Sequence, residues 1–458
     1  MPLLERMGAM ASDLLSIGIS GAKAARVALD VTAQNIANAG TDGYVRRSVG
    51  LAEVASTGYQ GTVRDVSLSG VRVDRIVRNA DAFRQSEVRR TASDTARADA
   101  EVSGLGNAEA ALEQSGVYPA ITAFESSLQK LQEDPTDTAL RASVIETTRT
   151  MTSTFQIASR QLDAVGTGLR FQAADGVTQV SRIAGELART NLRLARASDA
   201  SSDQTALLDQ RDKLLSDLSQ YGDIATSLAA DGSVTVTLGT AASGPPTPPL
   251  VSGGNAAALA MVTAPDGTIG FTLNGAALSL SGGSIAGQAQ ALGKLGQLRD
   301  DLDDLAADIV TTVNTVQGAG TARDGSAGAD LLTGTTAAAI ALATGDPAKI
   351  ATAPAGAPAG SRDPGNLDAL RSALAAANPA GRMDAILFDI SATVSGRTIT
   401  RDALATISGA AKTALVAQTG VDLDTEGVNL VRYQQAFQAS GRVMQVASTI
   451  FDSLLQIR

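Results

Sequence analysis

The stretch that decides the fold is residues 424–457, DTEGVNLVRYQQAFQASGRVMQVASTIFDSLLQI, which has the most regular apolar pattern in the chain. Apolar and small residues recur in it at alternating intervals of three and four, the period of a helix that packs lengthwise on another helix. The stretch contains no proline, so it predicts one long C-terminal helix. Its predicted packing seam consists of Leu430, Tyr433, Phe437, Ser440, Met444, Ala447, Phe451 and Leu454.

The opposite end of the chain repeats this pattern over residues 12–38, which predicts a second helix of the same kind. Small residues in the middle of its seam allow a neighbouring helix to approach closely. Its predicted seam consists of Leu14, Ile17, Gly21, Ala24, Ala28, Val31 and Asn35. A turn follows, in which asparagines bond nearby backbone, glycines allow positive φ and a tyrosine anchors the emerging chain. This turn motif consists of Asn35, Asn38, Gly40, Gly43 and Tyr44.

The pattern alone leaves two kinds of neighbour open for these terminal helices. They pack on each other or on the rest of the chain, or they pack among several subunits of an assembly. Isolated helices are marginal in water, and burial of one seam does not offset the cost of ordering a helix of this length. The C-terminal helix therefore needs burial on more than one face.

The part between the two ends reads as a helical body interrupted by β structure. Residues 44–75 look extended, and helical patterns resume near residue 80. Val234, Val236 and Leu238 alternate with polar residues, and Asn274–Gly275 is a hairpin signal. Separate helices are expected over 140–169, 177–197, 204–220, 286–317, 366–376, 382–394 and 402–419, with a loop over 318–365.

The predicted fold class is mainly α with an inserted β domain: long terminal helices of the coiled-coil type, a helical-bundle body and a small outer β domain. The predicted domains are 1–75 (N-terminal helix and extended segment), 76–222 (first part of the body), 223–285 (β domain), 286–410 (second part of the body) and 411–458 (C-terminal helix).

Composition narrows the classes of function. The 458 residues include no cysteine and no histidine, which excludes thiolate chemistry, zinc fingers and every histidine-dependent triad. The formal net charge is −10, so no nucleic-acid partner is expected. We interpret the basic clusters Arg46–Arg47, Arg89–Arg90 and Arg72/Arg75/Arg78 as solvated or ion-paired faces. No apolar run is long enough for a transmembrane helix, and no membrane contact or cleaved signal peptide is expected.

Two features could suggest chemistry. Asp300, Asp301, Asp303 and Asp304 form an acidic cluster, but Leu302 and Leu305 place it on an amphipathic helix, so we interpret it as a solvated face. The segment 282–286, GGSIA, only superficially resembles a nucleophile elbow, and we interpret it as a small-residue loop. We therefore expect no catalytic residue, no metal site and no cofactor.

Both ends resemble a known family. The stretch 33–47, AQNIANAGTDGYVRR, resembles the N-terminal signature of bacterial flagellar rod, hook and hook-associated proteins. Residues 421–437 resemble the matching signature at the other end. The ending 450–458, IFDSLLQIR, the internal segment 207–215, LLDQRDKLL, and Asp81-Ala82-Phe83 look most like the members at the hook–filament junction. The residues before Met10 precede the family-like part, so Met10 is an alternative first residue.

The resemblance implies a structural protein that joins hook to filament. Its terminal helices would form the inner layer of a tube, through packing with copies of itself, the hook protein and a second junction or filament protein. Export would use the flagellar type III route, with a cytoplasmic chaperone on the C-terminal helix beforehand. The alternatives are a rod, hook or flagellin-like subunit, or a secreted protein with an enzymatic or metal-binding outer domain.

Overall fold

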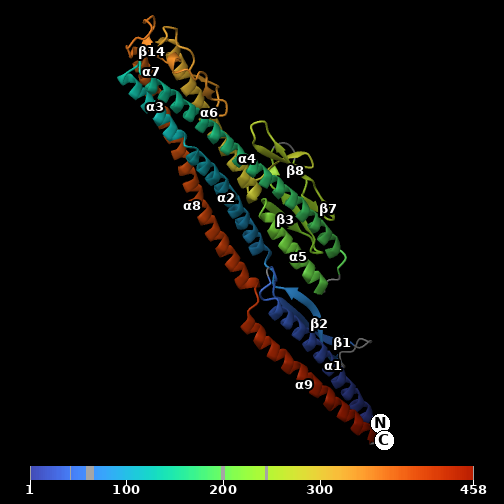
Figure 1. The fold of residues 1–458 in the computed structure, drawn as a ribbon. Helices are drawn as coiled ribbons and strands as arrows, with labels where there is room; N and C mark the ends of the chain where they lie inside the picture. Colours follow the sequence, from blue (N-terminus) through green and yellow to red (C-terminus); the bar gives the residue numbers. More distant parts are fainter. Residues whose placement is uncertain (1, 42, 58–65, 198–201, 243–245, 457–458) are drawn as a thin grey trace.

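The structure, a computed structural model, describes residues 2–41, 43–57, 66–197, 202–242 and 246–456. The molecule is long and narrow, and its two termini lie together at one end (Figure 1). The predicted fold class is confirmed: long helices dominate, and a β region is inserted among them. The helices are α1 (Pro2–Ala37), α2 (Ala82–Ser115), α3 (Val117–Glu133), α4 (Thr138–Leu194), α5 (Ser202–Ser219), α6 (Gly283–Gly318), α7 (Gly365–Ala377), α8 (Pro379–Thr419) and α9 (Leu423–Gln456).

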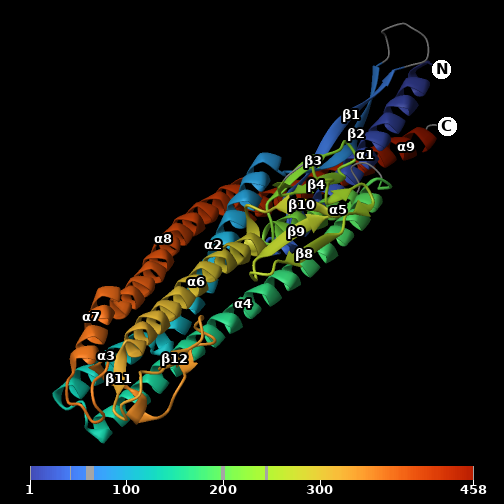
Figure 2. The same ribbon diagram turned by 90° about the horizontal axis from the view of Figure 1, so that it is seen from above.

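The helical body consists of α2, α4, α6 and α8, which lie alongside one another, with α3 and α7 at the end far from the termini (Figures 1 and 2). Its core is a continuous apolar cluster that includes the fully buried Phe124, Phe155 and Leu162. Apolar residues at helical spacing on each helix face this cluster, and their burial is the main stabilising contribution to the body.

The β domain lies beside the second half of α4 and consists of two four-stranded antiparallel sheets. Val234, Val236 and Leu238 are buried against α4 and α5, as their alternation predicts. Asn274 and Gly275 both have positive φ and make the predicted hairpin turn. The strands are β3 (Ile224–Leu228), β4 (Val234–Leu238), β6 (Val251–Ser252) and β7 (Asn255–Ala256) in one sheet, and β5 (Thr240–Ala241), β8 (Leu259–Thr263), β9 (Ile269–Leu273) and β10 (Ala276–Ser279) in the other.

The chain enters and leaves the β domain at neighbouring points. Ser284 N, at the start of α6, donates a hydrogen bond of 2.8 Å to Gln220 O, just after α5. Gly283 has φ 79°, and a Cβ on it would lie 2.2 Å from the carbonyl carbon of Tyr221. Only glycine fits this crossing without displacing backbone. The inserted segment therefore begins and ends at a single place on the helical body.

Two strands, β1 (Arg47–Thr57) and β2 (Val66–Arg78), pair antiparallel next to α1. They account for most of the stretch that the sequence predicts as extended, while residues 58–65 within it lie outside the described residues. Val71 N donates to Ser20 Oγ at 3.2 Å, which fixes β2 against α1. The hairpin thus covers one face of the N-terminal helix.

Two helices are longer than the sequence pattern indicates. The predictions of separate segments over 140–169 and 177–197 are wrong, because α4 is continuous and its buried stripe runs on through Ala173 and Gly176. The predictions over 382–394 and 402–419 are also wrong, because α8 is one helix. Ion pairs from Arg397 to Glu101 and from Arg401 to Asp99 hold its middle, where the apolar pattern is weak. The expected domain boundary at 410/411 falls inside α8, and the chain turns at Gly420.

The loop predicted over 318–365 contains short strands and one turn of 3₁₀ helix, so that prediction is wrong in part. Buried polar side chains hold the strands in place: Gln317 accepts from Ala351 N at 2.7 Å, and Asn366 donates to Ala351 O at 2.8 Å. Such bonds leave no periodic apolar signal in the sequence. The elements are β11 (Gly320–Ala322), β12 (Leu332–Thr333), β13 (Ala341–Leu342), β14 (Ala351–Pro354) and the 3₁₀ turn Pro347–Lys349.

Candidate functional site

The two terminal helices lie side by side and bring both chain ends together (Figures 1 and 2). Glycines on α1 permit the close approach. A Cβ on Gly18 would lie 2.7 Å from Met444 Cγ, and one on Gly21 would lie 2.7 Å from Ser440 Oγ. The sequence pattern leaves open whether the terminal helices pack within the chain or among several subunits. The structure shows packing within the chain, because α9 lies along the seam of α1.

The seam of α1 is well covered. It faces α9 on one side and the β1–β2 hairpin on another. Ala24, Ala28, Val31 and Asn35 are buried, while Leu14, Ile17 and Gly21 are partly buried.

The seam of α9 is covered on one face only. Ala447 is buried, and Leu430, Tyr433, Ser440 and Met444 are partly buried, but Phe437 is 44% exposed and Phe451 is 40% exposed. Leu454 lies within α9, but its side chain falls outside the described residues. Among the described side chains of α9, only Glu426 and Ala447 are buried.

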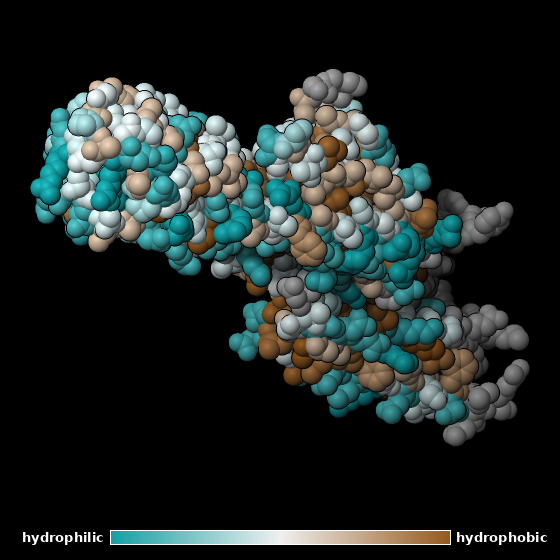
Figure 3. All heavy atoms as spheres, turned by 45° about the horizontal axis from the view of Figure 1, so that its top comes forward, coloured by the Kyte–Doolittle hydropathy of each residue, from teal (hydrophilic) through white to brown (hydrophobic). Residues whose placement is uncertain are grey.

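Further apolar side chains on α9 face solvent, since Val428 is 70% exposed and Val446 is 56% exposed. Hydrophobic residues gather visibly on the terminal helices, more densely than on the far end of the body (Figure 3). Clustered exposed apolar residues are typical of interaction surfaces. We name the set Val428, Val431, Phe437, Val446 and Phe451 the α9 apolar face.

Asn35 is the centre of the predicted turn motif, and its side chain reaches across the chain. Its Oδ1 accepts from Arg47 N at 3.0 Å and from Tyr44 Oη at 2.9 Å. Its Nδ2 donates to Arg47 O at 2.8 Å and to Glu426 Oε2, on α9, at 3.2 Å. Asn35 is only 1% exposed. It therefore fixes α1, the start of β1 and α9 relative to one another.

The rest of the motif forms the turn itself. Asn38 Nδ2 donates to Gln34 O at 2.9 Å, the local bond expected at a helix end. Gly43 has φ 78°, as predicted, whereas Gly40 does not adopt positive φ, and nothing lies within 4 Å of a Cβ placed on it. Asp42 lies outside the described residues. Burial raises the pKa of the Tyr44 hydroxyl, whose ring also stacks under the Arg47 guanidinium at 5.1 Å.

A network of charges next to Asn35 joins the terminal helices to the body. Arg46 Nε contacts Glu426 Oε1 at 2.7 Å, and Arg47 Nη2 contacts Asp209 Oδ2, on α5, at 2.8 Å. Arg78 Nη2, at the end of β2, lies 2.8 Å from both Asp209 Oδ1 and Asp212 Oδ2. We call Asn35, Arg46, Arg47, Arg78, Asp209, Asp212 and Glu426 the junction network.

Asp212 of the junction network holds its charge despite burial. Burial alone would raise the pKa of Asp212, but the charges of Arg211 and Arg78 and their hydrogen bonds hold it below its ordinary value. Glu426 is 1% exposed. Charges at this depth position elements strongly, because separating them leaves a buried charge without a partner.

Sequence reasoning missed the partners of these arginines. The sequence leaves a solvated and an ion-paired face open for the clusters Arg46–Arg47 and Arg72/Arg75/Arg78. The ion pairs of Arg46, Arg47 and Arg78 confirm the ion-paired alternative for these three residues. The sequence did contain a signal for Glu426. It lies four residues before Leu430, so it continues the α9 seam by one helical turn toward the N-terminus of the helix. Asp209 and Asp212 lie in the family-like segment 207–215 between pairs of leucines.

The sites suggested for chemistry lie elsewhere. Asp303 accepts from Ala337 N at 2.7 Å, and burial raises the pKa of its carboxyl, while Asp300, Asp301 and Asp304 are exposed on α6. In the part of the chain that the structure describes, no three acidic residues gather in a way that could hold a metal ion. The prediction of a loop over 282–286 is wrong in part, because α6 begins at Gly283 and Ser284 lies in its first turn. No described helix is long and apolar enough to cross a membrane.

Three family matches follow the same division into body and ends. Residues 105–332 match "Flagellar hook-associated protein FlgK helical domain". Residues 15–44 match "Flagella basal body rod protein", and residues 414–457 match "Flagellar basal body rod FlgEFG protein C-terminal". The matched ranges together make up more than half of the chain and include most of α1 and all of α9.

Curated relatives carry the same description. The chain is 27% identical over 335 residues to "Flagellar hook-associated protein 1" of Escherichia coli, covering 70% of this chain and 59% of the relative. It is 28% identical to the Bacillus subtilis protein of that name and 26% identical to the Salmonella typhimurium one, covering 46% and 50% of this chain and 43% and 41% of theirs. The chain thus spans about half the length of the curated relatives it matches.

A solved structure is also similar in part. It is the flagellar hook junction protein FlgK from Burkholderia pseudomallei, which aligns with a TM-score of 0.49 and 22% identity over 54% of this chain and 46% of that one. The family matches to the helical domain and to both ends agree with the curated relatives on the family of this chain. This chain belongs to the family of flagellar hook-associated protein 1.

Proposed function

We propose that the chain is a structural component of the bacterial flagellum that joins the hook to the filament and performs no catalysis. The observation that carries the proposal is the α9 apolar face, which stays exposed although the helix is packed along α1. A helix with this much exposed apolar surface gains stability from further neighbours. Those neighbours are copies of this chain, the hook protein and the next junction or filament protein.

The junction network supports a mechanical role. It links α1, β1, β2, α5 and α9 through buried hydrogen bonds and ion pairs, at the place where the terminal helices meet the body. In the proposed assembly, α1 and α9 form the inner layer of the tube and the helical body the next layer. The β domain lies at the side of the body, where it faces outward.

The route to this location follows from the same resemblance. The proposal includes export through the flagellar type III channel and a cytoplasmic chaperone that covers α9 beforehand. An exposed apolar helix such as α9 needs protection from aggregation before assembly. The domain ranges 1–75, 76–222, 223–285, 286–410 and 411–458 remain our proposed division.

Two variants test the proposal. Phe437→Asp and Phe451→Asp each place a charge on the α9 apolar face, so we expect loss of filament growth in cells whose only copy carries either change. We expect the melting temperature of the purified chain to fall by only a few degrees, because both side chains are about two-fifths exposed. The matched control Gln435→Asp, at an exposed polar position of α9, should leave growth intact.

Removal of residues 424–458 gives a second test. We expect the shortened chain to keep a folded body and to lose assembly at the hook. Filament growth supported by the shortened chain would contradict the proposal. So would phenylalanine variants whose loss of filament growth is accompanied by a large fall in the melting temperature of the purified chain.

A further inference from the structure

Phe388 on α8 is the most exposed large apolar side chain of the second half of the body, at 74%. α8 lies along α2 and, among the described residues, none from Ser391 to Gln418 is buried. Ala385 and Ala392, one turn to either side of Phe388, are also exposed. The phenyl ring therefore stands out from a surface of small residues.

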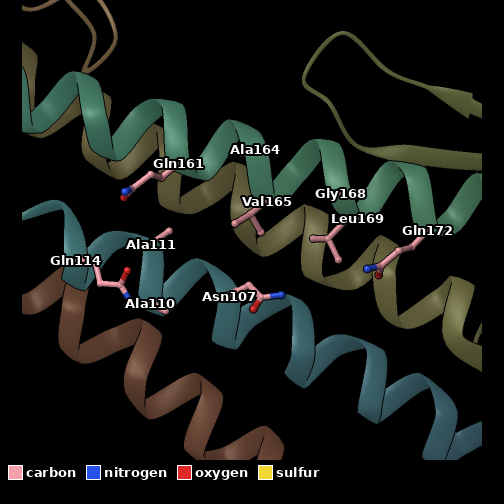
Figure 4. A pocket seen from close by; sticks show the side chains of 10 residues that line it. All are labelled: Asn107, Ala110, Ala111, Gln114, Gln161, Ala164, Val165, Gly168, Leu169 and Gln172. Carbon is pink, nitrogen blue, oxygen red and sulfur yellow. The ribbon is translucent and has the colours of Figure 1, made fainter.

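A hollow of about 480 Å³ lies on the same body, between α2 and α4 (Figure 4). Ala110, Ala111, Ala164 and Gly168 supply small side chains to it, and every residue that lines it is uncharged. Nothing lies within 4 Å of a Cβ placed on Gly168. Gln161 Oε1 is buried there and accepts no hydrogen bond from any described residue. The hollow thus offers space for an apolar side chain beside an unused acceptor.

Phe388 and the hollow lie at the same level along the body. Gly104 on α2 packs against Leu169 on α4, and Glu101 on α2 pairs with Arg397 on α8 at 3.0 Å. α4 and α8 both run opposite to α2 (Figure 1). Counting residues along the helices from these contacts places Ala110, Ala164 and Phe388 at one level.

The charges one turn away are complementary in the same register. Asp384 precedes Phe388 by four residues, and Arg160 precedes Ala164 by four residues, on helices that run in the same direction. Both side chains are exposed, and neither makes an ion pair with another described residue. An α8 that brought Phe388 to Ala164 of another molecule would also bring Asp384 to Arg160.

We propose that Phe388 of one copy of this chain inserts into the α2–α4 hollow of the next copy, with Asp384 facing Arg160. The two surfaces differ, so the contact is head-to-tail and repeats from copy to copy, which generates a ring or a helical row. The contact rests on the proposed function, because it joins copies through their bodies in addition to their terminal helices.

Engineered cysteines test this contact directly, since the natural chain contains none. The full chain carrying Asp384→Cys and Arg160→Cys is produced in the native cells in place of the natural chain, and isolated flagella are treated with a mild oxidant. We expect a ladder of dimers, trimers and larger species on a non-reducing gel, and its loss on reduction. The control pair Asp384→Cys and Arg182→Cys, which uses an exposed position further along α4, should yield no ladder.

The outcomes separate this contact from the proposed function. Absence of the natural chain from isolated flagella would overturn the proposed function. Three results would overturn the contact alone: the Asp384→Cys/Arg160→Cys chain is present in flagella but forms no ladder, its product stops at the dimer, or the control pair forms an equal ladder. A product that stops at the dimer would indicate two-fold pairing of copies. Absence of a ladder would indicate that another protein occupies the hollow.

Charge reversal provides an independent arm. Asp384→Arg and Arg160→Asp should each lower the amount of chain retained in flagella several-fold, and the double variant should restore it. Phe388→Ala should lower it as well, whereas Ile399→Ala, at a 69% exposed position of the same helix, should not. Failure of the double variant to recover would count against the pairing.

Discussion

Asn35→Ala removes the side chain at the centre of the junction network. Four hydrogen bonds are lost, to Arg47 N, Arg47 O, Tyr44 Oη and Glu426 Oε2, and all lie between 2.8 and 3.2 Å. A net hydrogen bond contributes about 1 kcal/mol, and a buried group left without a partner costs ~1–3 kcal/mol. We expect the free energy that opens the α1–α9 pair to fall by about 2–4 kcal/mol.

Hydrogen–deuterium exchange of amides in α1 and α9 measures this opening free energy. A loss of 2–4 kcal/mol corresponds to exchange faster by roughly 30-fold to 800-fold, because each ~1.4 kcal/mol is a factor of ten. Exchange in α3 and α7, at the far end of the body, should not change. Asn38→Ala is the matched control, since the Asn38 side chain makes only exposed local bonds, to Gln34 O and from Thr41 Oγ1. Equal acceleration by the two variants, or none by Asn35→Ala, would refute this role of Asn35.

Three further predictions concern other positions. Gly18→Val should separate α1 from α9 and lower the melting temperature, because even a Cβ at this position meets Met444. Gly441→Ala has open space around it and should stabilise α9 by about 0.5–1 kcal/mol. Calorimetry of the two variants distinguishes these outcomes. Because the pKa of Asp212 is depressed in the folded protein, its carboxylate contributes to the free energy of unfolding at pH values above the ordinary pKa of 3.8, and this contribution is lost as pH falls below that value. Asp212→Asn should therefore lower the free energy of unfolding at neutral pH. In urea titrations from pH 7 to pH 3, the variant should also lose less stability on acidification than the natural chain. Arg141 is fully buried and donates to Pro135 O, Ile350 O and Thr352 Oγ1, and burial lowers its pKa to about 10, so Arg141→Lys should cost ~2–3 kcal/mol in urea unfolding.

The sequence predicted those elements whose pattern is periodic and uninterrupted. The seam of residues 424–457 matched α9 almost to the residue, and the alternation at Val234, Val236 and Leu238 matched β4. Periodicity reports that a face is buried and does not report which neighbour buries it. The pairing of α1 with α9 was therefore one of two open alternatives.

The remaining errors have a common physical cause. The middle of α8 is held by Arg397 and Arg401, and β11 and β14 are held by Gln317 and Asn366, so polar contacts between distant residues take the place of an apolar stripe. The same holds for the junction network, where Asn35 contacts a glutamate that is 391 positions away. Such contacts appear only when the chain is folded.

The hydrogen bond between Ser284 N and Gln220 O makes the β domain a removable cassette. Because its two stems touch, a foreign domain with adjacent ends can be spliced between them without stretching α5 or α6. A short bridge could equally close the gap. The β domain can therefore diversify, or be replaced by a domain engineered for display, while the helical body that supports it keeps its shape.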